Sequence, residues 1–281
     1  PVDDAAMHHV FDGGWIWVLR FNNGITSAGV AARDRLANEL TFSQGEAAWK
    51  HLLKRLPMVR EQFAEAETVF PFVHMPRVSF RSGAVSGAGW TLLPSAAGFI
   101  DPLLSTGFPL TLLGVSRLAE AFENDLRSER FTLQLAKYAE KTVMEFEATE
   151  RLVAALYANL HDFPVFVALS LLYFAAASYA ETARRLGKSE SASSFLLCGD
   201  PVFGPAARAL TERAVEGLKA TERPQLLEQI RQLIEPVNLA GLSDPTRRNW
   251  YPVNARDLLN GAGKLGVTRK EMEELLWISS G

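Results

Sequence analysis

The sequence has very little cysteine, few histidines and no excess of charge of either sign. Cys198 is the single cysteine among 281 residues, which excludes a disulfide framework and a cysteine-based metal centre. The 5 histidines show no metal-ligand spacing, so no metal is expected. With 29 basic against 32 acidic side chains, no basic surplus is available to neutralise phosphates. Nucleic acid is therefore not an expected partner.

Motifs of several enzyme classes are also missing, namely the GxSxG nucleophile elbow and the P-loop. Residues 261–266 spell GxGxxG, but residues 254–260 before them are helical in pattern and no strand precedes. We interpret these glycines as a helix C-cap and a loop. The uncharged stretch from Phe163 to Ala180 contains Pro164 and several polar residues, which favours a buried or surface helix over a membrane span. The sequence thus predicts a cytoplasmic protein without a membrane partner.

The order of the patterns predicts an α+β fold, in which a strand-rich N-terminal part precedes a mainly α-helical C-terminal part. Residues 7–33 alternate as strands, and Asn22-Asn23-Gly24 predicts a hairpin with a two-residue type I′ turn. Ser43 and Glu46 suggest a capping box that opens a helix to Leu56. Strand character returns over 69–93. The predicted helices are 58–66, 109–126, 129–160, 164–187, 206–219, 224–235 and 269–277, the last with a capping box at Thr268 and Glu271.

One segment, from Trp90 to Leu118, carries a chemical signal. A strand leads into small residues, a turn at Asp101-Pro102, and Ser105-Thr106-Gly107 at the start of a helix. Free N–H groups and the positive end of a helix dipole form a site for an anion or a polarised carbonyl. Glycine there lets another molecule approach the backbone. The alternative is an ordinary capping turn between a strand and a helix.

The same residues carry a family resemblance. Residues 98–107, GFIDPLLSTG, resemble the second flavin-contacting segment of flavin-dependent halogenases and their FAD monooxygenase relatives. Residues 15–20, WIWVLR, resemble the Trp-x-Trp-x-Ile-Pro motif of these halogenases, and Asp244-Pro245 with residues 249–252 resembles a C-terminal feature of some relatives. The N-terminal dinucleotide-binding half of that family has no counterpart here, and the chain opens Pro-Val-Asp-Asp. We therefore expect the C-terminal portion of such a protein.

The resemblance implies a division into three parts. Residues 1–95 would be the antiparallel sheet fragment of a flavoprotein substrate domain. Residues 96–127 would hold the second flavin segment and its helix, and residues 128–281 a helical C-terminal region. The implied cofactor is FAD. Reduced FAD and oxygen would give a flavin hydroperoxide that oxidises a halide or the substrate, with a flavin reductase as the partner that supplies reduced FAD.

The resemblance also assigns roles to residues, although it identifies no catalytic residue. Backbone N–H groups at Thr106 and Gly107 would lie near the halide, and Trp15 and Trp17 would wall off the flavin side. Leu104 stands where tryptophan halogenases carry a catalytic Glu. An apolar residue there suits relatives that act on a small-molecule phenol or pyrrole or on a carrier-bound aromatic substrate, or enzymes that do not halogenate. The implied cofactor-binding residues are Gly98, Phe99, Asp101, Pro102, Ser105, Thr106 and Gly107.

Two other functions remain open. Arg20 stands where the tryptophan motif has Pro, which allows an FAD monooxygenase or reductase that does not halogenate. Pro94-Ser95 stands where such flavoproteins often carry Gly-Asp, and a long apolar helix is predicted over 164–187. These features allow a helical interaction or membrane-surface module built on a degenerate flavoprotein core.

Overall fold

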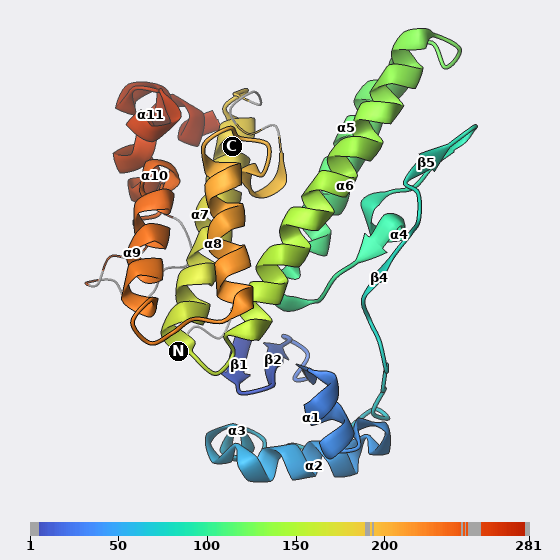
Figure 1. The fold of residues 1–281 in the computed structure, drawn as a ribbon, viewed down its shortest axis with the longest axis vertical. Helices are drawn as coiled ribbons and strands as arrows, with labels where there is room; N and C mark the ends of the chain where they lie inside the picture. Colours follow the sequence, from blue (N-terminus) through green and yellow to red (C-terminus); the bar gives the residue numbers. More distant parts are fainter. Residues whose placement is uncertain are drawn as a thin grey trace. The chain divides into compact units, whose positions relative to one another are not determined.

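The computed structural model of this chain describes residues 6–188, 192, 194–242, 244, 246 and 254–278 (Figure 1). The motif residues 249–252 and Pro245 lie outside this described part. The chain forms two compact units, each described here by itself. Unit 1 comprises residues 1–78 and 160–163, and unit 2 comprises residues 79–159 and 164–281.

Unit 1 is built around a three-stranded antiparallel sheet in the order β1-β2-β3. Strand β2 pairs with both neighbours, with Trp17 opposite His8 on one side and Gly29 on the other. Ile16 and Val18 point to the face that forms an apolar core with the helices of this unit. The elements are β1 (Met7–Phe11), β2 (Gly14–Arg20), β3 (Thr26–Ala32), α1 (Asp34–Glu39), η1 (Phe42–Gln44), α2 (Glu46–Arg55) and α3 (Pro57–Gln62).

The predicted hairpin is present, but its turn is longer than predicted. Phe21 donates its N–H to the carbonyl of Ile25 at 2.9 Å, so three residues form the loop. Gly24 adopts φ +80°, the left-handed conformation that closes such a loop, and Asn23 accepts the N–H of Ile25 on its side chain. The Asn-Gly pair therefore occupies the second and third loop positions.

Two other local predictions for the first part of the chain are wrong. Ser43 lies within η1, and α2 has Gly45 as its N-cap with no side-chain cap. Strand character over 69–93 is confined to the short strands β4 (Phe80–Arg81), β5 (Ser86–Gly87) and β6 (Trp90–Thr91). Pro71 and Pro76 interrupt the apolar run and lack the N–H that strand pairing needs.

Unit 2 is helical, as predicted, and its long helices begin and end within a few residues of the predicted limits. Helix α5 packs beside the 30-residue helix α6, which also packs against α8 (Figure 1). The capping box of Thr268 and Glu271 is present. The elements after β6 are α4 (Pro94–Ala97), β7 (Gly98–Phe99), η2 (Leu103–Ser105), α5 (Gly107–Phe122), α6 (Glu129–Ala158), α7 (Phe163–Arg185), η4 (Phe195–Leu197), α8 (Phe203–Glu216), α9 (Arg223–Ile234), η5 (Glu235–Val237), α10 (Ala255–Gly261), η6 (Ala262–Leu265) and α11 (Arg269–Ile278).

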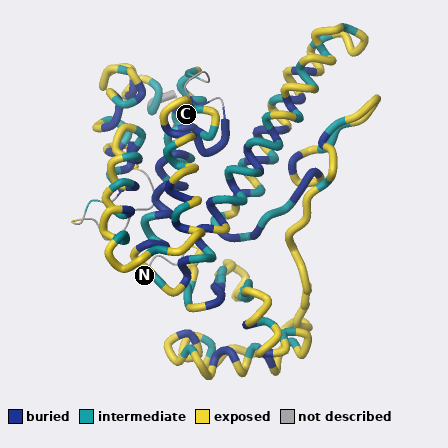
Figure 2. The backbone as a smooth tube through the Cα atoms, in the orientation of Figure 1, coloured by how far each residue is buried: buried dark blue, intermediate teal, exposed yellow. Residues whose placement is uncertain are grey.

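Helix α7 is the one element, among the residues described, that is long and apolar enough to cross a membrane by length and composition. More than half of its most apolar window, 56%, is buried, and Figure 2 shows buried residues along its length. The ring of Tyr173 packs edge-on against that of Phe195 at 6.2 Å. Of the two alternatives that the sequence left open, a buried or a surface helix, this burial and packing favour the buried one.

Candidate functional site

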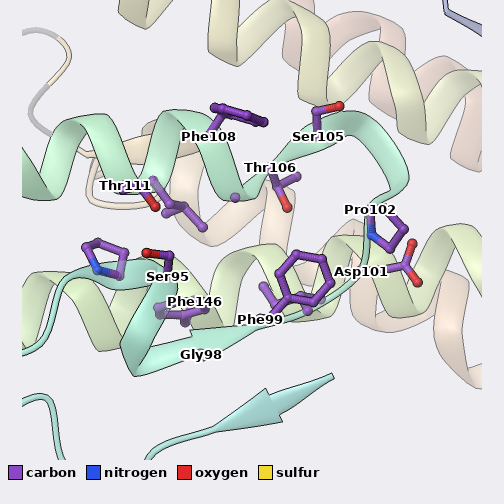
Figure 3. Close-up of a pocket in the computed structure, with 14 residues that line it drawn as sticks. Ser95, Gly98, Phe99, Asp101, Pro102, Ser105, Thr106, Phe108, Thr111 and Phe146 are labelled. Carbon is purple, nitrogen blue, oxygen red and sulfur yellow. The ribbon is translucent and has the colours of Figure 1, made fainter. Parts of the chain in front are cut away.

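The segment singled out by the sequence forms one continuous path in unit 2. Strand β7 pairs antiparallel with β4, with Phe99 opposite Phe80. The chain then turns at Asp101-Pro102, passes through η2, and enters α5 at Gly107. Figure 3 shows α5 lying over the stretch from Ser95 to Phe99. Strand β7, which the sequence did not predict, therefore lies close to the predicted turn and helix start.

Gly98 allows the close packing at the base of this path. A Cβ atom here would lie 3.1 Å from the carbonyl oxygen of Phe80 and 3.3 Å from the ring of Phe146. Its backbone is extended, with φ 179°, so the requirement for glycine is one of space. Phe146 on α6 thereby reaches the site directly.

The carboxylate of Asp101 is buried and anchors the turn. Its Oδ1 accepts the backbone N–H of Leu103 at 2.8 Å, and its Oδ2 accepts the hydroxyl of Tyr157 at 2.8 Å. The hydrogen bond to Leu103 closes an Asx-turn, in which an Asp side chain accepts the N–H of the residue two positions later. The second hydrogen bond joins the turn to α6. Both carboxylate oxygens of Asp101 thus contact the protein itself.

The turn that follows is strained. Leu104 and Ser105 both adopt the left-handed conformation, with φ 62° and 52°. Each costs about 1–2 kcal/mol for a residue other than glycine. Ser105 donates its N–H to the carbonyl of Pro102 at 3.0 Å, and Leu103 is 1% exposed. Strain of this kind persists where the surroundings hold it, and it concentrates at functional sites.

The N-terminus of α5 is open. Thr106 is its N-cap with helical backbone, and no side chain caps the helix. Pro109 in the first turn has no N–H, so Gly107 and Phe108 carry the first N–H groups of the helix. A Cβ on Gly107 would meet only the ring of Phe99, at 3.9 Å. Nothing in unit 2 that the structure describes requires glycine at this position, and the space beside it is free.

These residues surround a cavity of about 420 Å³, a size typical of small-ligand sites (Figure 3). Thr106 and Thr111 point from α5 toward Ser95 and Phe99, whereas Ser105 and Phe108 point away. All seven residues predicted to bind the cofactor line this cavity: Gly98, Phe99, Asp101, Pro102, Ser105, Thr106 and Gly107.

Sequence reasoning missed several other wall residues. Leu110 and Thr111 lie three and four positions after Gly107, so helical spacing alone places them on the same face. Phe146 comes from α6, about 40 residues farther along the chain, and no local pattern marks it. Tyr157, about 50 residues farther along, does not line the cavity but donates a hydrogen bond to the wall residue Asp101. Their part in the site is visible only in the folded chain.

The two tryptophans predicted to shield the flavin lie in unit 1. Their rings lie on one face of β2 with centroids 5.7 Å apart, and Trp15 is 1% exposed. His8 packs beside Trp15 at 5.0 Å, and burial, together with the nearby His9, lowers its pKa. Gly29 leaves room for the ring of Trp17. The shielding role of the tryptophans stays a prediction.

Two other kinds of site concern the rest of the chain, a metal centre and a dinucleotide-binding loop. Within the described residues, no group of three or more His, Cys, Asp or Glu side chains could hold a metal ion. The GxGxxG letters at 261–266 begin at the last residue of α10, run through η6 and end at its C-cap, Gly266. Gly266 there is left-handed with φ 63°, as in a helix C-cap. The dinucleotide interpretation is thereby excluded.

An open helix N-terminus beside a strained turn and a cavity makes this segment the candidate small-molecule site of an α+β protein. The sequence model of the tryptophan halogenase family matches residues 5–164, more than half of the chain. The chain belongs to the tryptophan halogenase family. Its matched region contains both the tryptophans of β2 and the cavity segment, so the two motifs that carried the resemblance fall within it.

Individual relatives and a solved structure also support membership of this family. Tetracycline 7-halogenase of Kitasatospora aureofaciens is 26% identical over 100% of this chain and 55% of its own length. The halogenase PrnC of Pseudomonas fluorescens is 29% identical over 60% of this chain and 31% of its own. The crystal structure of halogenase PltM in complex with phloroglucinol and FAD matches 82% of this chain and 50% of that protein, at 25% identity and a TM-score of 0.61. The chain spans about half the length of these relatives or less.

Proposed function

We propose that this chain is the C-terminal portion of an FAD-dependent halogenase, with its flavin and halide site at the N-terminus of α5. The observation that carries the proposal is the convergence of the seven motif residues on one cavity beside an uncapped helix start. The PltM complex with FAD supports the choice of cofactor. Bound and reduced, FAD would supply the oxygen-activating chemistry.

The residues of the cavity suit one edge of a flavin ring. The open space at Gly107 lets a flat ring approach the backbone, because a Cβ there would occupy free space beside Phe99. The uncapped N–H groups at the start of α5 would donate to a ring carbonyl. Asp101 has both oxygens engaged within the protein, so its proposed role is to shape the loop along the ring.

The same helix start suits a halide ion. The positive end of the α5 dipole and the N–H groups at Thr106 and Gly107 would hold an anion. The apolar walls formed by Phe99, Leu110 and Phe146 would exclude water from it, which strengthens the interaction of a charge with the backbone dipoles. Binding and desolvation of the halide are thus assigned to this turn.

The substrate is proposed to be an electron-rich aromatic compound, free or carrier-bound. Leu104 places an apolar side chain in the strained turn where tryptophan halogenases carry a catalytic Glu. A phenol or pyrrole carries its own activating group and needs less help from such a carboxylate. A relative from Pseudomonas fluorescens is a 1H-pyrrole-2-carbonyl-[peptidyl-carrier protein] chlorinase. A flavin reductase as the source of reduced FAD and a cytoplasmic location complete the proposal.

An FAD monooxygenase or reductase without halogenation is the second candidate. Arg20, at the end of β2, departs from the Pro of the halogenase tryptophan motif, and this departure favours it. The two candidates differ in whether product formation depends on chloride or bromide. A membrane-surface module resting on α7 is less well supported, because most of that helix's apolar window is buried.

The test is an FAD titration, followed by fluorescence quenching, of the full natural protein that contains this chain. Gly107→Leu should weaken FAD binding by about tenfold or more, because the side chain would occupy the ring space. Gly263→Leu is the matched control, since a Cβ at Gly263 meets nothing within 4 Å and that residue also lies in a helix.

Halide dependence then separates the two candidates. Turnover of an aromatic substrate with reduced FAD should require chloride or bromide and yield a halogenated product. Oxygenated product formed equally well without halide would favour the monooxygenase. Failure of the natural protein to bind FAD would overturn the flavoenzyme proposal.

A further inference from the structure

The carboxylate of Asp101 connects two parts of unit 2 that are far apart in sequence. Its Oδ2 accepts the hydroxyl of Tyr157, in the last turn of α6, at 2.8 Å. Its Oδ1 accepts the N–H of Leu103 at the start of η2, also at 2.8 Å. Asp101 is 9% exposed, so both hydrogen bonds are largely shielded from water. One side chain thereby links a rigid helix to the turn that opens α5.

The linked turn is one that cannot hold its conformation unaided. Leu104 and Ser105 are consecutive left-handed residues with a side chain, and they immediately precede the N-cap Thr106. Backbone of this kind relaxes unless neighbouring groups constrain it. The hydrogen bond from Leu103 to Asp101 lies at the beginning of this turn, and the open N–H groups of α5 lie at its end.

We propose that Tyr157 is a positioning residue for the site at the N-terminus of α5, acting through Asp101. Its hydroxyl orients the Asp101 carboxylate, and Asp101 holds the turn that sets the directions of the N–H groups at Thr106 and Gly107. This inference rests on the proposed function, in which those groups hold the halide and the edge of the flavin. In this proposal Tyr157 contacts neither the halide nor the flavin, and it acts only through its hydrogen bond to Asp101.

The proposal follows from the energetics of anion binding by backbone dipoles. Hydrogen bonds prefer angles above about 150° and weaken steeply below about 120°, so a rotation of the turn that misaligns the N–H groups weakens binding without unfolding the protein. The aromatic ring of Tyr157 is half-buried and stays in place when only its hydroxyl is removed. The loss of the hydroxyl should therefore change the site far more than the fold.

The experiment compares Tyr157→Phe with Tyr179→Phe in the full natural protein. Tyr179 is also half-buried, and its hydroxyl donates to the carbonyl of Lys264 at 3.3 Å, within the C-terminal helices. We expect Tyr157→Phe to raise the KM for halide by about tenfold with a much smaller change in kcat. Tyr179→Phe should leave both constants unchanged, and both variants should melt close to the parent protein.

A second readout needs neither flavin nor turnover. Hydrogen exchange at the Leu103 amide reports its bond to Asp101, and Tyr157→Phe should speed it by about tenfold. The double variant, which combines Tyr157→Phe with Asp101→Ala, tests whether Tyr157 affects halide binding through Asp101. If Tyr157 acts through Asp101, adding Tyr157→Phe to Asp101→Ala changes halide KM no further.

The outcomes separate this inference from the proposed function. Normal halide dependence in the parent, with an unchanged halide KM and unchanged Leu103 exchange in Tyr157→Phe, overturns the positioning role and leaves the halogenase proposal intact. Additive effects of the two substitutions also overturn it. A parent protein with no halide-dependent turnover overturns both.

Discussion

Arg117 on α5 and Glu145 on α6 form a bidentate ion pair, with nitrogen–oxygen distances of 2.7 and 2.6 Å. Glu145 is 1% exposed and also accepts the backbone N–H of Phe195 at 2.6 Å on the same Oε1 that contacts Arg117. Three elements, α5, α6 and η4, are thus joined at one carboxylate. Phe146, the next residue of α6, lines the cavity. The ion pair therefore holds against α5 the part of α6 that carries Phe146.

We predict that Arg117→Ala destabilises the protein strongly. Removing one partner leaves the buried Glu145 charge without its counterion, which typically costs about 3–5 kcal/mol. Urea unfolding of the full chain measures the change. Arg208→Ala is the control, because Arg208 forms an ion pair with Glu212 on an exposed helix surface. Equal effects of the two substitutions would contradict the structural role assigned to Arg117.

We predict that Gly98→Ala damages both stability and flavin binding. The added Cβ would press on the carbonyl of Phe80 and the ring of Phe146, and overpacking of this kind costs about 1–3 kcal/mol. Thermal unfolding and FAD titration together measure the two effects. Gly83→Ala serves for comparison, since a Cβ at Gly83 meets nothing within 4 Å. If the Gly98→Ala protein kept the FAD affinity and the melting temperature of the parent protein, the close packing at Gly98 would have no importance for either property.

We predict that Cys198 reacts slowly with thiol reagents in the folded protein. Burial, followed by the nearby Glu145 charge, raises the pKa of this thiol to about 11. Because the thiolate is the nucleophile, its fraction at pH 8 falls about a hundredfold below that of an ordinary thiol. Iodoacetamide labelling of native and urea-unfolded protein measures the difference.

The same shift predicts the direction of a pH effect on stability. Between the usual pKa of a cysteine and about 11, the unfolded chain releases the thiol proton while the folded chain retains it. The Cys198 contribution to the free energy of unfolding therefore decreases as the pH rises through that interval. Cys198→Ser should flatten the pH dependence there, and an unchanged slope would rule out the thiol as its source.

Local patterns predicted most elements of this chain. Apolar residues at helical spacing located the long helices of unit 2, and Thr268 with Glu271 located the start of α11. Alternation located the sheet of unit 1. The strand prediction over 69–93 failed, because apolar content indicates burial but Pro71 and Pro76 prevent regular pairing. The capping box at Ser43 failed because a 3-10 turn and the left-handed Gly45 start α2 instead.

By itself, the sequence predicted which residues form the candidate site at the start of α5. Asp101 to Gly107 are consecutive, and a turn, a glycine and a helix start are local features that short-range sterics and hydrogen bonding specify. Only the tertiary structure decided how that turn is held. Phe146 and Tyr157 reach the site from α6, and their positions depend on how α6 packs beside α5. Such contacts join residues distant in the chain, so no local pattern encodes them, and the packing of the helices alone brings them together.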